Sequence, residues 1–243
     1  MGEKDVIFSQ PLEQIQNFTF DEKVAAVFPD MINRSVPGYA TVIAMTGVLA
    51  GQYAQENTNC YDLGCSLGES SFAMSQQLEM GNYQIIAVDN SPQMLDQCSA
   101  RLMQVGANQH VTLICDDILN IDFENASVIV MNYTLQFIAP EKRKALIARI
   151  YQSLKPGGIM LLSEKVRDAD PATDQRLIDM HHAFKKANGY SELEISQKRT
   201  ALEDVLLPET LQQHHERLKL AGFDQVDCWF QCFNFASLIA YKN

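Results

Sequence analysis

The sequence predicts a doubly wound α/β fold, in which a mostly parallel seven-stranded sheet carries helices on both faces. Apolar runs of strand length alternate with amphipathic stretches of helix length along the chain. The central runs are apolar throughout, as expected of parallel strands that are buried on both faces. A glycine-containing turn follows the first run, and two further runs at the end of the chain predict an antiparallel hairpin.

The N-terminal part of the chain predicts helices that flank the sheet. We expect a single domain of 243 residues, because this length supports one well-cored α/β unit. Residues 1–55 would form a helical flank or lid, with a short helix over 21–28 that leads to Pro29. An amphipathic helix would begin at Tyr39. Tyr39 would either pack in the core or form a wall of the ligand site.

The core, residues 56–163, opens with a strand and the turn Asp62-Leu63-Gly64-Cys65-Ser66-Leu67-Gly68. Gly64 and Gly68 allow backbone conformations barred to other residues and let a ligand approach the chain closely. The pattern is G-x-S-x-G and not the G-x-G-x-x-G of dinucleotide binders. This compact turn suits an adenosyl ligand without a pyrophosphate, above all S-adenosyl-L-methionine. Ordinary turn chemistry is the alternative.

The second strand, over residues 84–88, ends at an acid that fits the same ligand. Asp89 lies about 20 residues or somewhat more beyond the glycine turn, where a carboxylate accepts hydrogen bonds from both ribose hydroxyls. The alternative role is a helix N-cap, yet Ser91 and Pro92 already provide a cap and a first-turn proline. We therefore favour ribose binding by Asp89.

Two further strand ends complete the expected ligand site. After the strand at 110–115, the Asp117 carboxylate would accept from the adenine amino group while the Ile118 N–H meets a ring nitrogen. The alternative is a pair of solvated loop acids. The strand at 126–131 ends at Asn132, on the edge that faces the reacting centre in open α/β sheets. Its sequence is not the N-P-P-Y of amide and DNA-base methylation, so that chemistry is disfavoured.

The rest of the chain predicts one more βα unit, an insertion and a terminal hairpin. Residues 164–208 interrupt the alternation as a charged, helical insertion. The basic residues between Gly189 and Arg199 form either a local anion site or a solvated helix face. The remaining expected elements are a helix over 140–154, a strand over 159–163, and a terminal unit at 209–243 with a helix over 209–221 and strands at 226–230 and 235–240.

Composition restricts the function classes. The net charge of -11 repels phosphate backbones, which argues against direct nucleic-acid binding. The six cysteines show no C-x-x-C spacing, so we expect no metal site. The N-terminus lacks a basic and apolar signal peptide, and the longest apolar stretch is too short to span a bilayer. We therefore expect a cytoplasmic protein that acts on small molecules and does not contact the membrane.

Several strings resemble one family over essentially the whole chain. The glycine turn, Asp89 and Asp116-Asp117-Ile118 look like the class I S-adenosylmethionine-dependent methyltransferase fold, which is Rossmann-like. More narrowly, the chain resembles the carboxy-S-adenosyl-L-methionine synthase family of bacteria. The strings that carry this resemblance are FTFD at 18–21, VFPDMI at 27–32, RSVPGY at 34–39, YDLGCSLG at 61–68 and ANGYSELEISQKR at 187–199.

The resemblance implies an activity other than methyl transfer. That family converts S-adenosyl-L-methionine and prephenate to carboxy-S-adenosyl-L-methionine and phenylpyruvate. Its product then serves a separate tRNA carboxymethyltransferase that modifies the wobble uridine. By similarity, Arg199 would pair with the carboxylate added by the reaction, within its own subunit or across a homodimer. The residues that would bind the adenosyl ligand by similarity are Tyr39, Gly64, Cys65, Ser66, Asp89, Asn90, Asp117, Ile118 and Asn132.

Two other readings remain open at this point. A conventional S-adenosyl-L-methionine-dependent small-molecule methyltransferase would use the same fold. A non-catalytic S-adenosyl-L-methionine-binding protein would keep the ligand site without turnover. No pattern in the residues themselves identifies prephenate or names a proton acceptor.

Overall fold

The computed structural model describes residues 3–78 and 83–243, so Met1 and Gly2 of the N-terminus considered above lie outside the described residues. Helices and strands alternate through the central part of the chain, as predicted. In chain order the elements are α1 (Glu22–Ser35), α2 (Tyr39–Tyr53), β1 (Thr58–Leu63), α3 (Glu69–Gln77), β2 (Tyr83–Asp89), α4 (Pro92–Gln104), β3 (Val111–Cys115), β4 (Ala126–Asn132), the 3-10 helix η1 (Leu135–Phe137), α5 (Pro140–Ser153), β5 (Leu154–Arg167), α6 (Pro171–Ala187), α7 (Glu192–Leu202), β6 (Glu209–Thr210), α8 (Leu211–Ala221), β7 (Gln225–Cys232) and β8 (Phe235–Tyr241).

The strands form one sheet in the order β3-β2-β1-β4-β5-β8-β7, with the short β6 paired to β5 off this path. The first five strands are parallel, and β8 joins antiparallel to both β5 and β7. The predicted seven-stranded, mostly parallel sheet with a terminal antiparallel hairpin is therefore confirmed.

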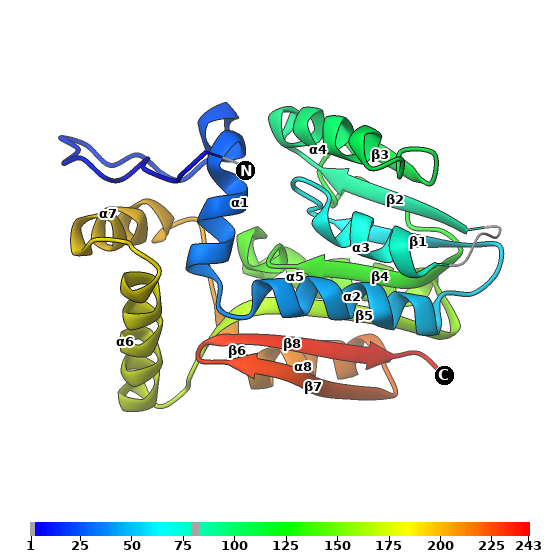
Figure 1. Ribbon diagram of the computed structural model, residues 1–243. Helices are drawn as coiled ribbons and strands as arrows, with labels where there is room; N and C mark the ends of the chain where they lie inside the picture. The colour runs from blue at the N-terminus through cyan, green and yellow to red at the C-terminus, as the bar shows by residue number, and fades with distance from the viewer. Residues whose placement is uncertain (1–2, 79–82) are drawn as a thin grey trace.

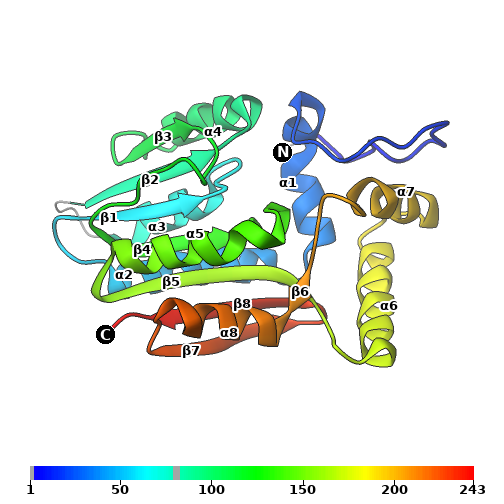
Figure 2. The ribbon, with the colours of Figure 1, turned by 180° about the vertical axis from the view of Figure 1, so that it is seen from behind.

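Helices cover both faces of the sheet. Figure 1 shows α2 and α3 in front of the strands, and Figure 2 shows α5 and α8 on the opposite face. Each face has its own apolar core: Met74 and Cys98 belong to the core under α3 and α4, whereas Ile147 and Leu218 belong to the core under α5 and α8. The central strands are buried on both sides, which explains why their sequences are continuously apolar.

A third group of elements lies beyond the carboxyl ends of the parallel strands. Helices α1, α6 and α7 and the N-terminal segment stand together at this edge in both ribbon views. The Gln197 side chain on α7 donates to the carbonyls of Phe8 and Gln10, at 2.9 and 2.8 Å, which holds the N-terminal segment against α7. The space between this group and the strand ends is where α/β sheets bind ligands.

Two predicted elements, α1 and β5, had the wrong bounds, and β5 begins at Leu154 instead of 159. Helix α1 does not end before Pro29 but continues to Ser35. Proline removes one hydrogen bond from a helix and crowds the carbonyl four residues earlier, yet the second half of α1 buries Met31 in a cluster with Leu67 and Met94. This burial outweighs the missing bond. Strand β5 extends to Arg167 instead of ending at 163, because its later residues pair with β8 and β6.

Candidate active site

A cavity of about 490 Å³ lies between the carboxyl ends of the parallel strands and the helices α1, α6 and α7. Aromatic rings from α1, from the loop before it and from the loop after β4 form part of its wall. The predicted ligand-binding residues that line the cavity are Tyr39, Gly64, Cys65, Ser66, Asp89, Asn90, Asp117, Ile118 and Asn132. Of the predicted set, only Arg199 is not among the residues that line it.

The turn after β1 is held in the left-handed backbone region. Gly64 has φ +77° and Ser66 has φ +49°. A Cβ at Gly64 would lie 2.2 Å from Thr134 Oγ1, so the absence of a side chain lets this turn pack against the loop after β4. The buried Asp62 carboxylate accepts from the Ser71 N–H and hydroxyl at 2.9 and 2.7 Å, joining β1 to α3. Burial raises the pKa of Asp62 to about 6, against these hydrogen bonds, which lower it.

Asp89 connects the glycine turn to the end of β2. Its carboxylate accepts from the Ser66 N–H and from the Ser91 N–H, both at 2.9 Å. The N-cap of α4 is Ser91, whose side chain accepts from Met94 N–H, so Asp89 is not needed for that role. An ionised carboxylate has about four acceptor positions, so these two bonds leave acceptor capacity on Asp89, which lines the cavity. This arrangement suits the binding of ribose hydroxyls.

The loop after β3 presents one acceptor and one donor to the cavity. Asp117 is exposed, and its carboxylate accepts from the Leu119 N–H at 2.9 Å, which leaves further acceptor positions. The Ile118 side chain is buried. Within residues 3–78 and 83–243, no acceptor takes the Ile118 N–H. The amino group of adenine needs an acceptor, and the ring nitrogen beside it needs a donor. The Asp117 carboxylate and the Ile118 N–H are groups of these two kinds.

Asn132 lies at the end of β4, in the middle of the sheet edge. Its amide nitrogen donates to Thr46 Oγ1 at 3.2 Å and to Ser70 Oγ at 3.0 Å. Its buried Oδ1 has no hydrogen-bond partner among the described residues. Since an unpaired buried acceptor is costly, this oxygen is available to a donor of a bound ligand, such as an ammonium group.

The tyrosines near Asn132 remain neutral. Burial raises the pKa of Tyr39 far above its ordinary value, and the Glu69 carboxylate adds to the shift. Tyr39 and Tyr133 lie with their ring centroids 6.1 Å apart, and both line the cavity. Aromatic faces attract cations, so this part of the cavity suits a sulfonium group.

Sequence reasoning missed Glu164, which shapes the loop after β4. This buried residue of β5 accepts from the backbone N–H groups of Thr134, Leu135 and Gln136 at 3.2, 2.8 and 3.0 Å. Burial raises the pKa of Glu164 to about 8, although these donors and Arg143 act to lower it. The only sequence signal was its place directly after a predicted strand.

Sequence reasoning did not assign Lys165, His181 and Lys185 to the site. For the basic residues between Gly189 and Arg199 it left open an anion site or a solvated helix face, and the structure places Lys198 at the cavity and exposes Arg199. Lys165 of β5, Lys185 and His181 of α6, and Lys198 of α7 line the cavity. The His181 ring nitrogen donates to the Ser35 carbonyl at 2.8 Å, and burial lowers the pKa of His181 to about 3, so this ring is neutral. The signal for these residues was the basic character of the late helices in an otherwise acidic chain.

Arg199 follows the cavity-lining Lys198 on α7, but its own side chain is exposed. It lies close enough to Lys165 that, after burial, its charge is the next cause that lowers the pKa of that lysine. The guanidinium therefore stands outside the basic end of the cavity in the single chain.

The described residues offer neither a metal-binding cluster nor a membrane-spanning helix. In the part of the chain that the structure describes, no three His, Cys, Asp or Glu side chains gather as a metal site would require. None of its described helices is both long enough and apolar enough to cross a bilayer.

Comparison with known proteins relates the chain to one family from end to end. A methyltransferase domain family matches residues 61–158. The carboxy-S-adenosyl-L-methionine synthase of Geobacter sp. (strain M21) is 55% identical over 239 residues, which cover 98% of each chain. The protein of the same name from Pseudoalteromonas atlantica is 55% identical over 240 residues, covering 99% of this chain and 98% of the relative.

Solved structures with low sequence identity share the fold. A methyltransferase from Methanococcus maripaludis, described as S-adenosyl-L-methionine-dependent, superposes with a TM-score of 0.61 at 19% identity and covers 96% of this chain and 98% of its own. Human N-acetylserotonin methyltransferase, solved with S-adenosyl-L-methionine, gives a TM-score of 0.60 at 16% identity over 91% of this chain and 55% of its own. These neighbours support the class I methyltransferase fold.

Proposed function

This chain belongs to the carboxy-S-adenosyl-L-methionine synthase family, and we propose that it makes carboxy-S-adenosyl-L-methionine from S-adenosyl-L-methionine and prephenate, with release of phenylpyruvate. The observation that carries this proposal is the end-to-end identity with these synthases, together with a cavity lined by nine of the ten predicted binding residues. The product would be the carboxymethyl donor for a separate tRNA carboxymethyltransferase.

In the proposed site, the adenosyl group lies at the acidic end of the cavity. Asp89 accepts from the ribose hydroxyls, and the Asp117 carboxylate with the Ile118 N–H holds the adenine. The sulfonium then lies near Asn132 and Tyr39, at the middle of the sheet edge. The distances and free hydrogen-bonding positions described above support this placement.

The reaction itself needs positioning and a dry site. A sulfonium stabilises a carbanion on the adjacent methyl, so loss of a methyl proton gives an ylide. Prephenate loses its ring carboxylate as carbon dioxide and its ring hydroxyl as hydroxide, and becomes phenylpyruvate. The ylide carbon attacks the carbon dioxide, and the methyl proton and the hydroxide together form one water. Aromatic side chains such as Phe20, Phe137 and Phe235 line the cavity and would keep bulk water from the ylide.

We further propose that Arg199 pairs with the new carboxylate, across a homodimer. Its exposure in the single chain and its position outside the cavity lining support a role at a neighbouring subunit's site. An arginine fork binds a carboxylate through two parallel hydrogen bonds. Residues 1–55 would form the helical flank or lid of this single-domain enzyme, and residues 164–208 its helical insertion.

The test is incubation of the purified protein with labelled S-adenosyl-L-methionine and prephenate, followed by mass spectrometry of the small molecules. We expect a product heavier than S-adenosyl-L-methionine by one carbon dioxide, together with phenylpyruvate. Formation of S-adenosylhomocysteine without use of prephenate would instead identify a conventional methyltransferase. Bound S-adenosyl-L-methionine without turnover would identify a non-catalytic binding protein.

A further inference from the structure

The charged residues that line the cavity are separated by sign. The acids Glu69, Asp89, Asp116 and Asp117 all follow the strands β1, β2 and β3, whereas Lys165, Lys185 and Lys198 come from β5 and the helices beyond it. A fourth lysine of the lining, Lys142, lies in the first turn of α5 and is exposed. The whole chain carries a net charge of -11. Three lysines at one end of the cavity therefore give it a local positive charge in an acidic protein.

Two of these lysines lack an acidic partner. Lys185 is only 8% exposed, and Lys165 is half-buried. In the described part of the chain, neither ammonium group takes part in an ion pair or a side-chain hydrogen bond. The nearest compensation belongs to Lys198, whose Nζ lies 3.8 Å from Asp5 Oδ2 and donates to Ser35 Oγ at 3.3 Å.

Burial makes the charged form of these lysines costly. Burial lowers the pKa of Lys185 to about 7, and the charges of Lys198 and Lys165 add to the shift. Burial likewise lowers the pKa of Lys198 to about 8. Grouping buried like charges costs stability. The charges of Asp5 and Asp174 act in the opposite direction on Lys185 and Lys165, and a bound anion would reduce the remaining cost.

We propose that Lys165, Lys185 and Lys198 form the subsite that receives the carboxylates of a small dicarboxylate, which is the second substrate. This inference rests on the proposed function, because prephenate carries two carboxylates. The three lysines come from β5, α6 and α7 and line a cavity of about 490 Å³, which is the size of a site for small molecules.

The width of the sheet places the two ligands in one cavity. Strand β5 lies three positions from β2 in the order β2-β1-β4-β5. With neighbouring strands ~4.8 Å apart, Asp89 and Lys165 follow strands separated by about 14 Å. An adenosyl group at Asp89 thus leaves room for a second molecule at the lysines, and the sulfonium methyl lies between them near Asn132.

One other anion competes for this role, namely the amino-acid carboxylate of S-adenosyl-L-methionine itself. The two assignments differ in what the lysine variants lose. If the lysines bind the second substrate, its binding weakens while adenosyl ligands bind normally. If they bind the amino-acid carboxylate, the binding of S-adenosylhomocysteine weakens as well, because this ligand carries the same carboxylate.

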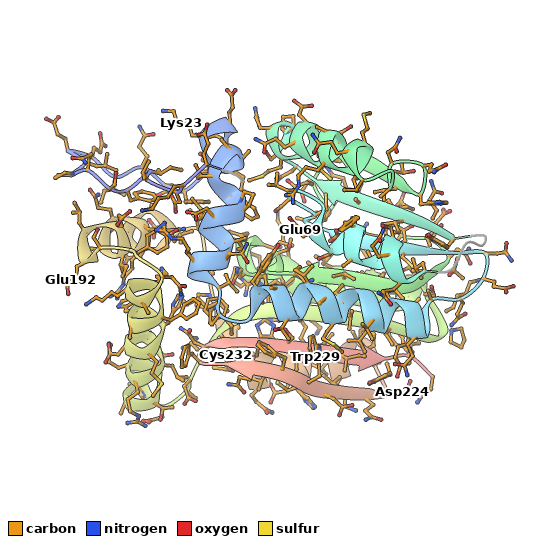
Figure 3. The ribbon with its side chains drawn as sticks, in the orientation of Figure 1. Lys23, Glu69, Glu192, Asp224, Trp229 and Cys232 are labelled. Carbon is orange, nitrogen blue, oxygen red and sulfur yellow. The ribbon has the colours of Figure 1, made fainter. Side chains whose placement is uncertain are left out.

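The experiment compares Lys165→Met and Lys185→Met with the matched control Lys186→Met in the full-length protein. Lys186 follows Lys185 on α6 but is exposed and pairs with Glu192 at 2.6 Å, and Figure 3 places Glu192 at the outer side of α7, away from the sheet. Steady-state turnover gives KM and kcat for prephenate, and calorimetry gives the Kd of S-adenosylhomocysteine. Normal binding of that ligand also shows that each variant is folded.

We expect each cavity variant to raise the KM for prephenate by roughly tenfold to a hundredfold, as the loss of a charge-assisted contact implies. The Kd of S-adenosylhomocysteine and all constants of Lys186→Met should stay unchanged. An unchanged KM in both cavity variants, or equal losses for prephenate and S-adenosylhomocysteine, would overturn the subsite.

The failure of the proposed function would look different. If the wild type forms no carboxy-S-adenosyl-L-methionine from prephenate, that function is wrong, and the subsite is tested by calorimetric titration of malonate into the S-adenosylhomocysteine complex. Malonate binding that is lost in Lys185→Met and kept in Lys186→Met supports a dicarboxylate subsite. No malonate binding, or equal binding to all three proteins, rejects it.

Discussion

The Asp89 carboxylate accepts a hydrogen bond from the Ser66 N–H at 2.9 Å, and this contact joins the glycine turn after β1 to the end of β2. A second bond from the Ser91 N–H fixes the other carboxylate oxygen. The carboxylate thus shapes the ligand turn while it keeps acceptor positions for a ribose. In the proposed site, the same two oxygens hold the turn and bind the ligand.

We expect Asp89→Asn to raise the Kd of S-adenosyl-L-methionine by roughly tenfold to a hundredfold, because charge-assisted hydrogen bonds are lost. The amide would also place its own N–H groups against one of the two backbone N–H donors, so one hydrogen bond of the turn would be lost. Isothermal titration calorimetry measures the change. The control is Asp96→Asn, the same substitution at an exposed position of α4. Equal affinities for both variants would mean that Asp89 serves only to hold the turn.

Gly64 and Gly106 offer a matched pair for testing the close approach of the turn to the loop after β4. Both have left-handed backbones, with φ +77° and +71°. A Cβ at Gly64 would lie 2.2 Å from Thr134 Oγ1, whereas one at Gly106 meets nothing within 4 Å. Conformational strain is therefore common to both alanine variants, and the steric clash is specific to Gly64→Ala.

We expect Gly64→Ala to lower the free energy of unfolding by roughly 1–3 kcal/mol more than Gly106→Ala does, which is the usual cost of overpacking. Urea titration followed by circular dichroism measures both losses. The Gly64 variant should also lose affinity for S-adenosyl-L-methionine, and the Gly106 variant should keep it. Similar losses of stability would show that Thr134 moves aside without cost.

The acidic half of the site could be predicted from the sequence because its residues follow a simple rule. Asp89, Asp117 and Asn132 each come directly or almost directly after a continuous apolar run, and the carboxyl ends of parallel strands meet at one edge. Local patterns were therefore enough to bring these residues together. The short glycine turn after β1 indicated the class of ligand.

The basic half could not be predicted in the same way. Lys165, Lys185 and Lys198 come from a strand and two helices, and nothing in their spacing brings them together. They meet because α6 and α7 dock on the end of α1, where Ser35 accepts from His181 and from Lys198. The sequence-based prediction ended α1 before Pro29. It therefore lacked the end of α1, which is the surface on which α6 and α7 pack.

Arg199 provides a test of substrate discrimination. We expect Arg199→Ala to raise the Kd of carboxy-S-adenosyl-L-methionine by tens to hundreds of fold, in line with about 1.5–3 kcal/mol for a charge-assisted contact. The Kd of S-adenosyl-L-methionine should be nearly unchanged, since it lacks the added carboxylate. Arg176→Ala, on the exposed part of α6, controls for the loss of one positive charge. Equal losses for both ligands would reject the role of Arg199.

Complementation between subunits distinguishes a partner's arginine from the chain's own. Co-expressed Asp89→Asn and Arg199→Ala subunits would form mixed dimers. If Arg199 acts on the neighbouring site, the subunit with intact Asp89 receives the intact arginine of its partner, and activity returns. If Arg199 acts within its own subunit, neither site is complete, and the mixed sample stays as inactive as the separate variants.

His214 of α8 gives a pH-dependent prediction that does not involve the ligand site. It is only 2% exposed, and burial lowers its pKa from 6.5 to about 4. The neighbouring Arg217 also disfavours a charged ring. Between these two values, the unfolded chain binds a proton that the folded chain does not. Protonation therefore favours unfolding as the pH falls below 6.5.

The size of this effect follows from linkage, at about 1.4 kcal/mol for each pH unit between the two pKa values. From pH 7 to pH 5, the wild type should lose about 2 kcal/mol more unfolding free energy than His214→Leu, which has no proton to bind at this position. Urea titrations at the two pH values measure the difference, and His215→Leu controls for adding a leucine to α8. Because other buried groups titrate equally in wild type and variant, their contributions cancel in the comparison. Parallel losses in wild type and His214→Leu would show that the folded protein accommodates a charged ring at this position.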